Sequence, residues 1–109
     1  MDLAAKLQLK PPARIEVINA PMPLDLPAGE GEAVLVFVET TAEVETAAGP
    51  AIEAARADRV AWIAYPKGGQ LGTDLNRDRL AALAKEHGVQ PVRQISIDDV
   101  WSALRLRPA

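Results

Sequence analysis

Two long apolar runs constrain the fold of this chain more than any other feature. Residues 33–38 and 59–65 are rich in β-branched and aromatic side chains and do not alternate with polar ones. A strand that is apolar on both faces is typical of a parallel sheet with both sides covered. We therefore predict that these two segments are central, parallel strands.

Helix signals lie in the segment that connects these runs. Residues 40–43 (Thr-Thr-Ala-Glu) match a capping box, which predicts a helix beginning near Thr41. The pair at 49–50 (Gly-Pro) interrupts that helix, and its proline can begin a second segment that continues to Ala57. We expect one kinked helix or two short ones, which is the crossover that a pair of parallel strands requires.

Further helices and a strand are predicted on either side. Residues 74–87 carry an apolar stripe at helical spacing, and Thr73 or Asp74 can cap this helix at its start. A short helix is expected over 2–9 and a β-branched strand over 14–18. The order of elements predicts an α/β sheet with helices on its faces.

The end of the chain predicts a hairpin. Residues 91–97 and 101–107 both alternate between apolar and polar side chains, and only three residues separate them. A parallel return needs about a dozen residues, so these two strands must be antiparallel. At 109 residues the whole chain, 1–109, is expected to form a single domain.

Composition excludes several classes of function. The chain has no cysteine and one histidine, which excludes a disulfide framework, a thiolate nucleophile and a cysteine metal site. A net charge of −3 does not supply the basic field of a nucleic-acid-binding protein. No apolar run approaches the roughly 18 residues of a membrane span, so we expect a cytoplasmic protein with no membrane association.

The charges are unevenly distributed along the chain. Residues 15–55 hold eight acidic residues and no lysine or arginine: Glu16, Asp25, Glu30, Glu32, Glu39, Glu43, Glu45 and Glu53. This segment is either a solvated acidic face or an acidic docking surface for a basic protein partner.

Three segments resemble a family of small bacterial proteins of unknown function. They are 62–67 (Trp-Ile-Ala-Tyr-Pro-Lys), 73–77 (Thr-Asp-Leu-Asn-Arg) and 97–104 (Ile-Asp-Asp-Val-Trp-Ser-Ala-Leu). The order of elements from Ala33 to Pro108 is similar to the second half of a class I S-adenosylmethionine-dependent methyltransferase. The resemblance implies a three-layer, Rossmann-like domain. Its mostly parallel, five-stranded sheet would have the order first-second-third-fifth-fourth, with the fifth strand antiparallel.

The chain departs from those methyltransferases where the cofactor would bind. A glycine-rich turn should follow the first strand, because the backbone must approach the cofactor closely. Here residues 19–23 (Asn-Ala-Pro-Met-Pro) follow it, and the first glycine is Gly29. We expect no S-adenosylmethionine binding and no other cofactor.

The loop after the second apolar run is the first candidate site. Residues 66–74 join a strand to a helix and contain Lys67, Gly68, Gly69 and Thr73. Free amides at a helix start, glycines that permit close approach and a lysine could hold a phosphate or carboxylate. Alternatively, the glycines only make the loop mobile, Thr73 or Asp74 only caps the helix, and Asp74 would itself repel an anion.

Polar residues at the ends of the parallel strands form the second candidate. Asn19, Thr40 and Tyr65 lie at the carboxyl edge of the predicted sheet, where ligands bind in open α/β folds. A Tyr65–Lys67 pair could polarise a carbonyl, with Glu39 as a general base. The carboxylate pair at 98–99 is typical of a turn, and we expect no metal site.

These observations favour a non-catalytic module that contacts a protein or binds a small anion. The alternative is a small enzyme whose site lies at the carboxyl edge of the parallel strands. The first strand is left at the edge of the sheet, and exposed edges invite pairing. We expect the N-terminal helix and the proline-rich loop at 20–32 to cover this strand, or two copies to pair there as a homodimer.

Overall fold

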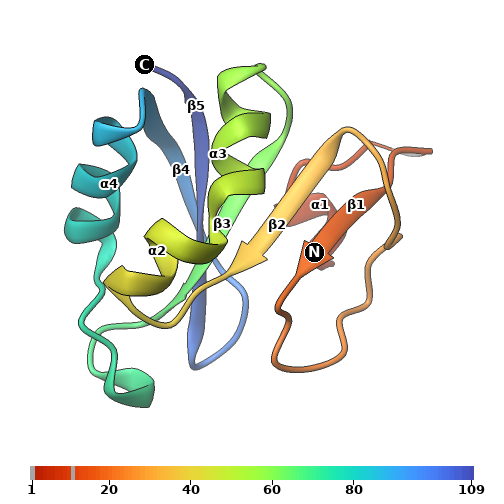
Figure 1. The fold of residues 1–109 in the computed structure, drawn as a ribbon. Coiled ribbons are helices and arrows are strands. Elements are labelled where there is room, and N and C mark those ends of the chain that lie inside the picture. The colour runs from red at the N-terminus through yellow and green to blue at the C-terminus, as the bar shows by residue number, and fades with distance from the viewer. Residues whose placement is uncertain (1, 11) are drawn as a thin grey trace.

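A five-stranded mixed sheet forms the centre of the structure, a computed structural model that describes residues 2–10 and 12–109 (Figure 1). The strand order is β1-β2-β3-β5-β4. The first three strands are mutually parallel, and β5 is antiparallel to both of its neighbours. The predicted α/β sheet and its order are therefore confirmed. The strands are β1 (Ile15–Ile18), β2 (Ala33–Phe37), β3 (Ala61–Pro66), β4 (Val89–Ser96) and β5 (Trp101–Pro108).

Three helices pack on one face of this sheet (Figure 1). They are α2 (Thr41–Ala47), α3 (Gly49–Arg56) and α4 (Arg77–Glu86), and a 3₁₀ turn, η1 (Gln70–Gly72), precedes α4. The other face carries α1 (Leu3–Lys6), which is a single turn, and apolar residues of the connection between β1 and β2. The two faces are thus covered by different means, three helices on one and mostly irregular chain on the other.

Alternate side chains of β5 point to opposite faces of the sheet and contribute to the hydrophobic core on each face. Leu104 and Leu106 pack with the helices, whereas Trp101 and Ala103 pack with Phe37 on the opposite face. A strand in the middle of a sheet buries both of its sides, and Leu104 is accordingly 0% exposed. The predicted insertion of the last strand into the sheet accounts for this burial.

The break between α2 and α3 follows the sequence signal. Thr40 caps α2 by accepting a hydrogen bond from the Glu43 backbone N–H, and Pro50 lies in the first turn of α3. Of the two predicted forms, one kinked helix or two short ones, the structure has two short helices, and α2 begins at Thr41 as predicted.

Two helix predictions were wrong at their ends. The helix expected over 2–9 ends at Lys6, because Gln8 adopts a left-handed backbone with a φ of 63°. The helix expected over 74–87 begins only at Arg77, and its cap is Asn76 rather than Thr73 or Asp74. Asp74 is instead bound to the start of α2.

The proline-rich loop covers part of the β1 edge. The Ile15 N–H donates to the Pro27 carbonyl at 3.0 Å, and the Gly29 N–H donates to the Ile15 carbonyl at 3.0 Å. Ile15 and Ala28 thereby form an isolated parallel bridge at the first residue of β1. The loop thus covers the start of this edge, and the pairing of two copies along it stays a prediction.

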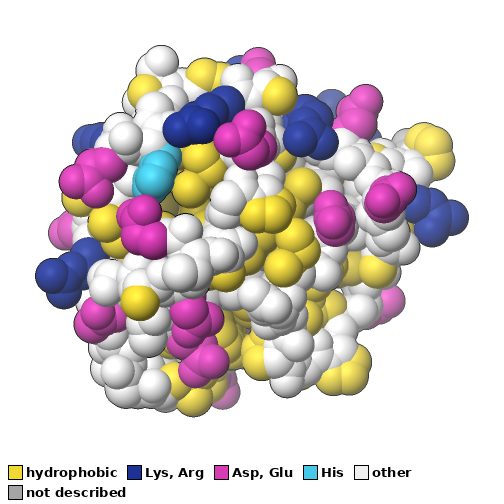
Figure 2. Space-filling model, in the orientation of Figure 1, with side chains coloured by type: hydrophobic (Ala, Val, Ile, Leu, Met, Phe, Trp, Pro, Cys, Tyr) yellow, Lys and Arg dark blue, Asp and Glu magenta, His cyan; other side chains and the backbone are white. Residues whose placement is uncertain are grey.

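The acidic half of the sequence does not produce a uniformly acidic helix face. Figure 2 shows acidic side chains around α2, which has no lysine or arginine, and acidic and basic side chains together over α3 and α4. The acidic charge of this face is therefore concentrated at α2.

Candidate functional site

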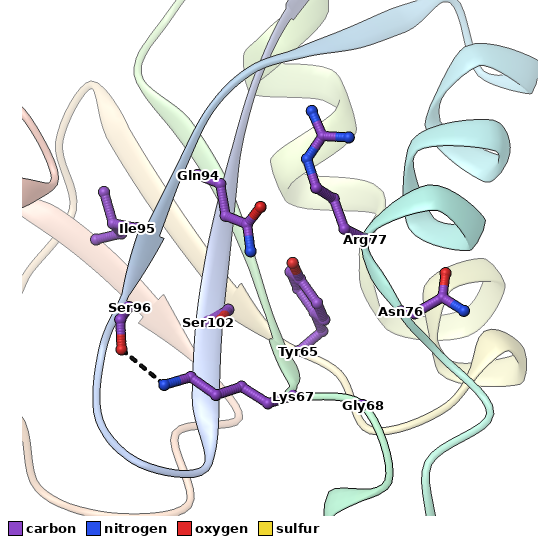
Figure 3. Close-up of a pocket in the computed structure, with 9 residues that line it drawn as sticks. All are labelled: Tyr65, Lys67, Gly68, Asn76, Arg77, Gln94, Ile95, Ser96 and Ser102. Atoms are coloured by element: carbon purple, nitrogen blue, oxygen red, sulfur yellow. Dashed lines mark hydrogen bonds between the residues drawn. The ribbon is translucent and has the colours of Figure 1, made fainter.

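Hydroxyl side chains from three adjacent strands lie in one row on the helix-covered face. Tyr65 on β3 is the register partner of Ser102 on β5, and Ser102 is the partner of Ser96 on β4. A hollow of about 530 Å³ lies over this row, between the hairpin and the start of α4 (Figure 3). We call it the Tyr65 pocket; it is lined by Tyr65, Lys67, Gly68, Asn76, Arg77, Gln94, Ile95, Ser96 and Ser102.

The Tyr65 hydroxyl is the least satisfied polar group of this pocket. Tyr65 is 2% exposed, and its hydroxyl has no hydrogen-bond partner among residues 2–10 and 12–109. Its side chain rises between Gln94 and Arg77 (Figure 3). Leaving a buried hydroxyl unpaired costs about 1–3 kcal/mol, so the fold holds a donor in place without supplying its acceptor.

Tyr65 stays protonated in this environment. Burial raises the pKa of its phenol, because the charged phenolate loses solvation. The positive charge of Arg77 opposes that rise, as do the polar side chains of Ser102 and Gln94, which lie near the hydroxyl without meeting hydrogen-bond geometry; together they do not reverse it. At neutral pH the group is therefore a neutral hydrogen-bond donor and not a base.

Lys67 is positioned by the hairpin. Its ammonium donates to the Ser96 hydroxyl at 2.8 Å (Figure 3), and that hydroxyl donates to the Asp98 carbonyl at 3.1 Å. Its backbone N–H donates to the Val100 carbonyl at 2.7 Å. The turn that supplies these groups is itself fixed by Asp98, whose carboxylate accepts from two backbone amides of the hairpin. Lys67 is thus held at the mouth of the Tyr65 pocket.

Arg77 adds a second positive charge. It begins α4, directly after the cap residue Asn76, so the free amides of the first helical turn lie beside it. Its guanidinium contacts the exposed Asp78 at 3.4 Å, and its side chain remains 53% exposed. The residues described as lining the pocket include two cations and no carboxylate, so its potential favours an anion.

Asp74 is bound to the start of α2 and does not line the Tyr65 pocket. Its carboxylate accepts from the Thr41 backbone N–H at 2.9 Å and from the Thr41 hydroxyl at 2.6 Å. These two bonds lower the pKa of Asp74, because they stabilise its charged form. Asp74 serves as an anchor between the loop and α2, and it lies outside the lining of the Tyr65 pocket.

The structure brings together three of the seven residues selected from the sequence: Tyr65, Lys67 and Gly68 line the pocket. The other four lie elsewhere. Thr40 caps α2, and the Thr73 hydroxyl donates to the Glu39 carbonyl at 2.5 Å and accepts from the Leu75 N–H. Gly69, with a φ of 82°, precedes η1, and Asn19 is exposed beyond β1 with a φ of 60°.

Six of the nine residues that line the pocket come from the start of α4 and from the hairpin, and none of the six was predicted from the sequence. The alternation of residues 91–97 places Gln94 and Ser96 on one side of a strand, which was a usable signal. Their distance from Tyr65 depends on the register of β5 against β3 and β4, and that register cannot be predicted from the sequence pattern. Arg77 was missed because the helix start was predicted three residues too early.

Glu39 is separated from the tyrosine and lysine that it was expected to assist. It lines a different hollow, together with Leu71, Asp98 and Trp101. Within the described ranges there is no group of three His, Cys, Asp or Glu side chains that could hold a metal ion. No helix in the same ranges is long and apolar enough to cross a membrane.

Comparisons of this chain with protein-family models, with curated proteins and with solved structures found no match.

Proposed function

We propose that this chain is a small-anion-binding module whose site is the Tyr65 pocket. The observation that carries the proposal is the buried Tyr65 hydroxyl, which has no acceptor in the described residues and lies between two cations. A bound phosphate or carboxylate would supply that acceptor. Hydrogen bonds to charged groups are worth more than neutral ones, so the ligand offsets the cost of burying the hydroxyl.

Each lining group has a distinct part in binding. The Tyr65 O–H donates to the anion, and Lys67 and Arg77 provide positive charge from opposite sides. Gln94 is an exposed side chain beside the hydroxyl, so it can turn aside as the ligand enters. The protonated Tyr65 can donate a hydrogen bond but is not a base, and the carboxylate Glu39 lies in another hollow. The arrangement therefore supports binding rather than proton transfer.

We also propose that the three-layer, Rossmann-like description and the kinship with the small bacterial family apply here. The sheet order with an antiparallel β5 supports this proposal. So does the meeting of the three resembling segments around one pocket: 62–67 supplies Tyr65 and Lys67, 73–77 supplies Arg77, and 97–104 supplies Ser102.

Calorimetric titration of the full chain with inorganic phosphate, in a non-phosphate buffer, tests the anion site. Tyr65→Phe keeps the ring and removes only the donor, and we expect it to weaken binding about ten-fold, the equivalent of one charged hydrogen bond. Lys67→Ala and Arg77→Gln should weaken binding by a similar factor, and both losses should shrink at high salt.

Lys85→Gln is the matched control, because Lys85 is exposed in the last turn of the same helix. It removes one positive charge and should leave the affinity unchanged. Equal losses for Lys85→Gln and Lys67→Ala would show a non-specific charge effect and would overturn the proposal, as would unchanged binding by Tyr65→Phe.

A further inference from the structure

A second hollow lies on the opposite face of the sheet, near the amino ends of β2 and β3. Its volume is about 460 Å³, and its lining includes Arg105 of β5 and Ala33 of β2. Arg105 is the register partner of Trp62, whose ring belongs to the core on the side away from α2, α3 and α4. We call this hollow the Arg105 pocket; it shares no lining residue with the Tyr65 pocket.

The guanidinium of Arg105 has one edge without an acceptor. Its Nη1 donates to Gln8 Oε1, while its Nε is buried and has no hydrogen-bond partner in the part of the chain that the structure describes. Nε and Nη2 together form the edge of a guanidinium that binds a carboxylate through two parallel hydrogen bonds. Among residues 2–10 and 12–109, no acceptor is bound at the Nε of that edge.

The surroundings of Arg105 are electrostatically unfavourable. Arg93 lies directly across from it on β4, and like charges in that relation destabilise a sheet. Burial lowers the pKa of Arg105, and the positive charges of Arg107 and Arg93 lower it further. The nearby carboxylate of Asp58, which is bound to Arg107 at 3.1 and 3.3 Å, opposes the lowering of this pKa and does not reverse it. An arginine remains charged under these conditions, so an added anion would relieve the repulsion.

The remaining walls are mostly aliphatic. Leu9, Ala13, Ala33 and Val60 contribute apolar side chains to the pocket, Lys10 adds positive charge, and Glu32 is the carboxylate in its lining. The guanidinium of Arg105 and these four aliphatic side chains match a ligand with one negative head and a short hydrocarbon body.

We propose that the Arg105 pocket binds a short aliphatic carboxylate. The two carboxylate oxygens accept from Nε and Nη2 of Arg105, and the hydrocarbon chain lies against Leu9 and Val60. Because Nε is closed to solvent in this structure, the exposed Gln8 side chain turns away as the ligand enters. Glu32 opposes binding through its charge.

Sodium hexanoate is the probe, and hexanamide, which has nearly the same shape without the charge, is its control. We expect an amide-resolved NMR titration of the full chain to show saturable shifts at Ala13, Ala33 and Val60. Hexanamide should bind at least about ten-fold more weakly, since it lacks the charged, paired hydrogen bonds.

Variants separate the proposed site from general charge effects. Arg105→Gln should abolish the hexanoate shifts, whereas Arg107→Gln on the same strand should retain them. Glu32→Gln changes an exposed residue and should tighten hexanoate binding several-fold, which keeps the test decisive if Arg105→Gln folds poorly. Equal affinity for hexanoate and hexanamide, or an unchanged affinity in Glu32→Gln, would overturn the proposal.

Discussion

The Tyr65 hydroxyl makes opposite contributions to stability and to binding. Tyr65→Phe removes a buried donor that has no partner in the described residues, so the free energy of unfolding should be unchanged or should rise by up to about 1 kcal/mol. The same variant should lose anion affinity. Urea unfolding measures the first effect, and a stability loss above about 1 kcal/mol would show that the hydroxyl has a structural partner instead.

Asp74 gives the protein a stability component that depends on pH. Its folded-state pKa lies below the unfolded value of about 3.9, because Thr41 donates two hydrogen bonds to the carboxylate. The stabilisation that the ionised Asp74 gives the folded state is therefore complete above the unfolded-state pKa. It is lost as the pH falls through the lower, folded-state pKa.

We accordingly expect Asp74→Asn to lower the urea midpoint at neutral pH. The difference in urea midpoint between the variant and the wild type should become smaller below about pH 4. Asp99→Asn, at the exposed hairpin tip, is the control for loss of one negative charge. A gap that stays constant down to pH 3 would contradict the assignment of the bonded carboxylate to Asp74.

At the scale of residues, the sequence identified the part of the site that lies within one loop. Tyr65 and Lys67 could be selected because a strand end followed by a glycine-rich turn is a recognisable signal. The role of Asp74 could not be predicted, since its partner Thr41 lies 33 residues away and only the packing of α2 beside the loop joins them.

Among the elements, β5 is the strand whose burial matters most for the stability of the fold. Leu104 is fully buried between β3 and β4 and under the helices, so Leu104→Ala should lower the free energy of unfolding by about 2–5 kcal/mol. Val92→Ala is the control, because Val92 is 50% exposed on β4 and should cost less than about 1 kcal/mol. Urea unfolding of both variants measures these changes in the free energy of unfolding. A loss for Leu104→Ala as small as that for Val92→Ala would mean that β5 is not buried inside the sheet.

The loop that covers β1 depends on Gly31. A Cβ at this position would lie 2.6 Å from the Arg14 carbonyl oxygen, so Gly31→Ala must displace the loop. We expect the Ile15 amide, which donates to Pro27, to lose protection in hydrogen exchange, and the uncovered edge to promote dimers in light scattering. An Ile15 amide that exchanges equally fast in the wild type would contradict the covering role of the loop.

Element types were predictable because their signals are local, and element ends were less so. The Gly49–Pro50 break is encoded in adjacent residues, and the structure places α2 and α3 on either side of it. The start of α4 depended on a competition between Thr73, Asp74 and Asn76, all of which can cap a helix. Contacts with Glu39 and Thr41 occupy the first two, which leaves the cap to Asn76.

For the whole molecule, the antiparallel pairing of β4 and β5 followed from the three residues between the predicted strands, and the insertion of β5 beside β3 followed from the family resemblance. Which helices lie on which face of the sheet could not be predicted from the sequence. The amphipathic stripes of α3 and α4 indicate that each helix packs on a sheet. They do not indicate that both helices lie on the same face as α2. The Tyr65 pocket depends on that arrangement, because α4 forms one of its walls.

The most direct test of the anion site is an amide-resolved NMR titration of the full chain with inorganic phosphate. We expect saturable shifts concentrated at Tyr65, Lys67, Gly68, Arg77 and Ser102, which come from three separate segments that meet only in the folded pocket. Tyr65→Phe should weaken that response and leave its location unchanged. Shifts that fail to saturate, or that spread over basic residues remote from the pocket such as Lys85 and Arg107, would contradict a built anion site.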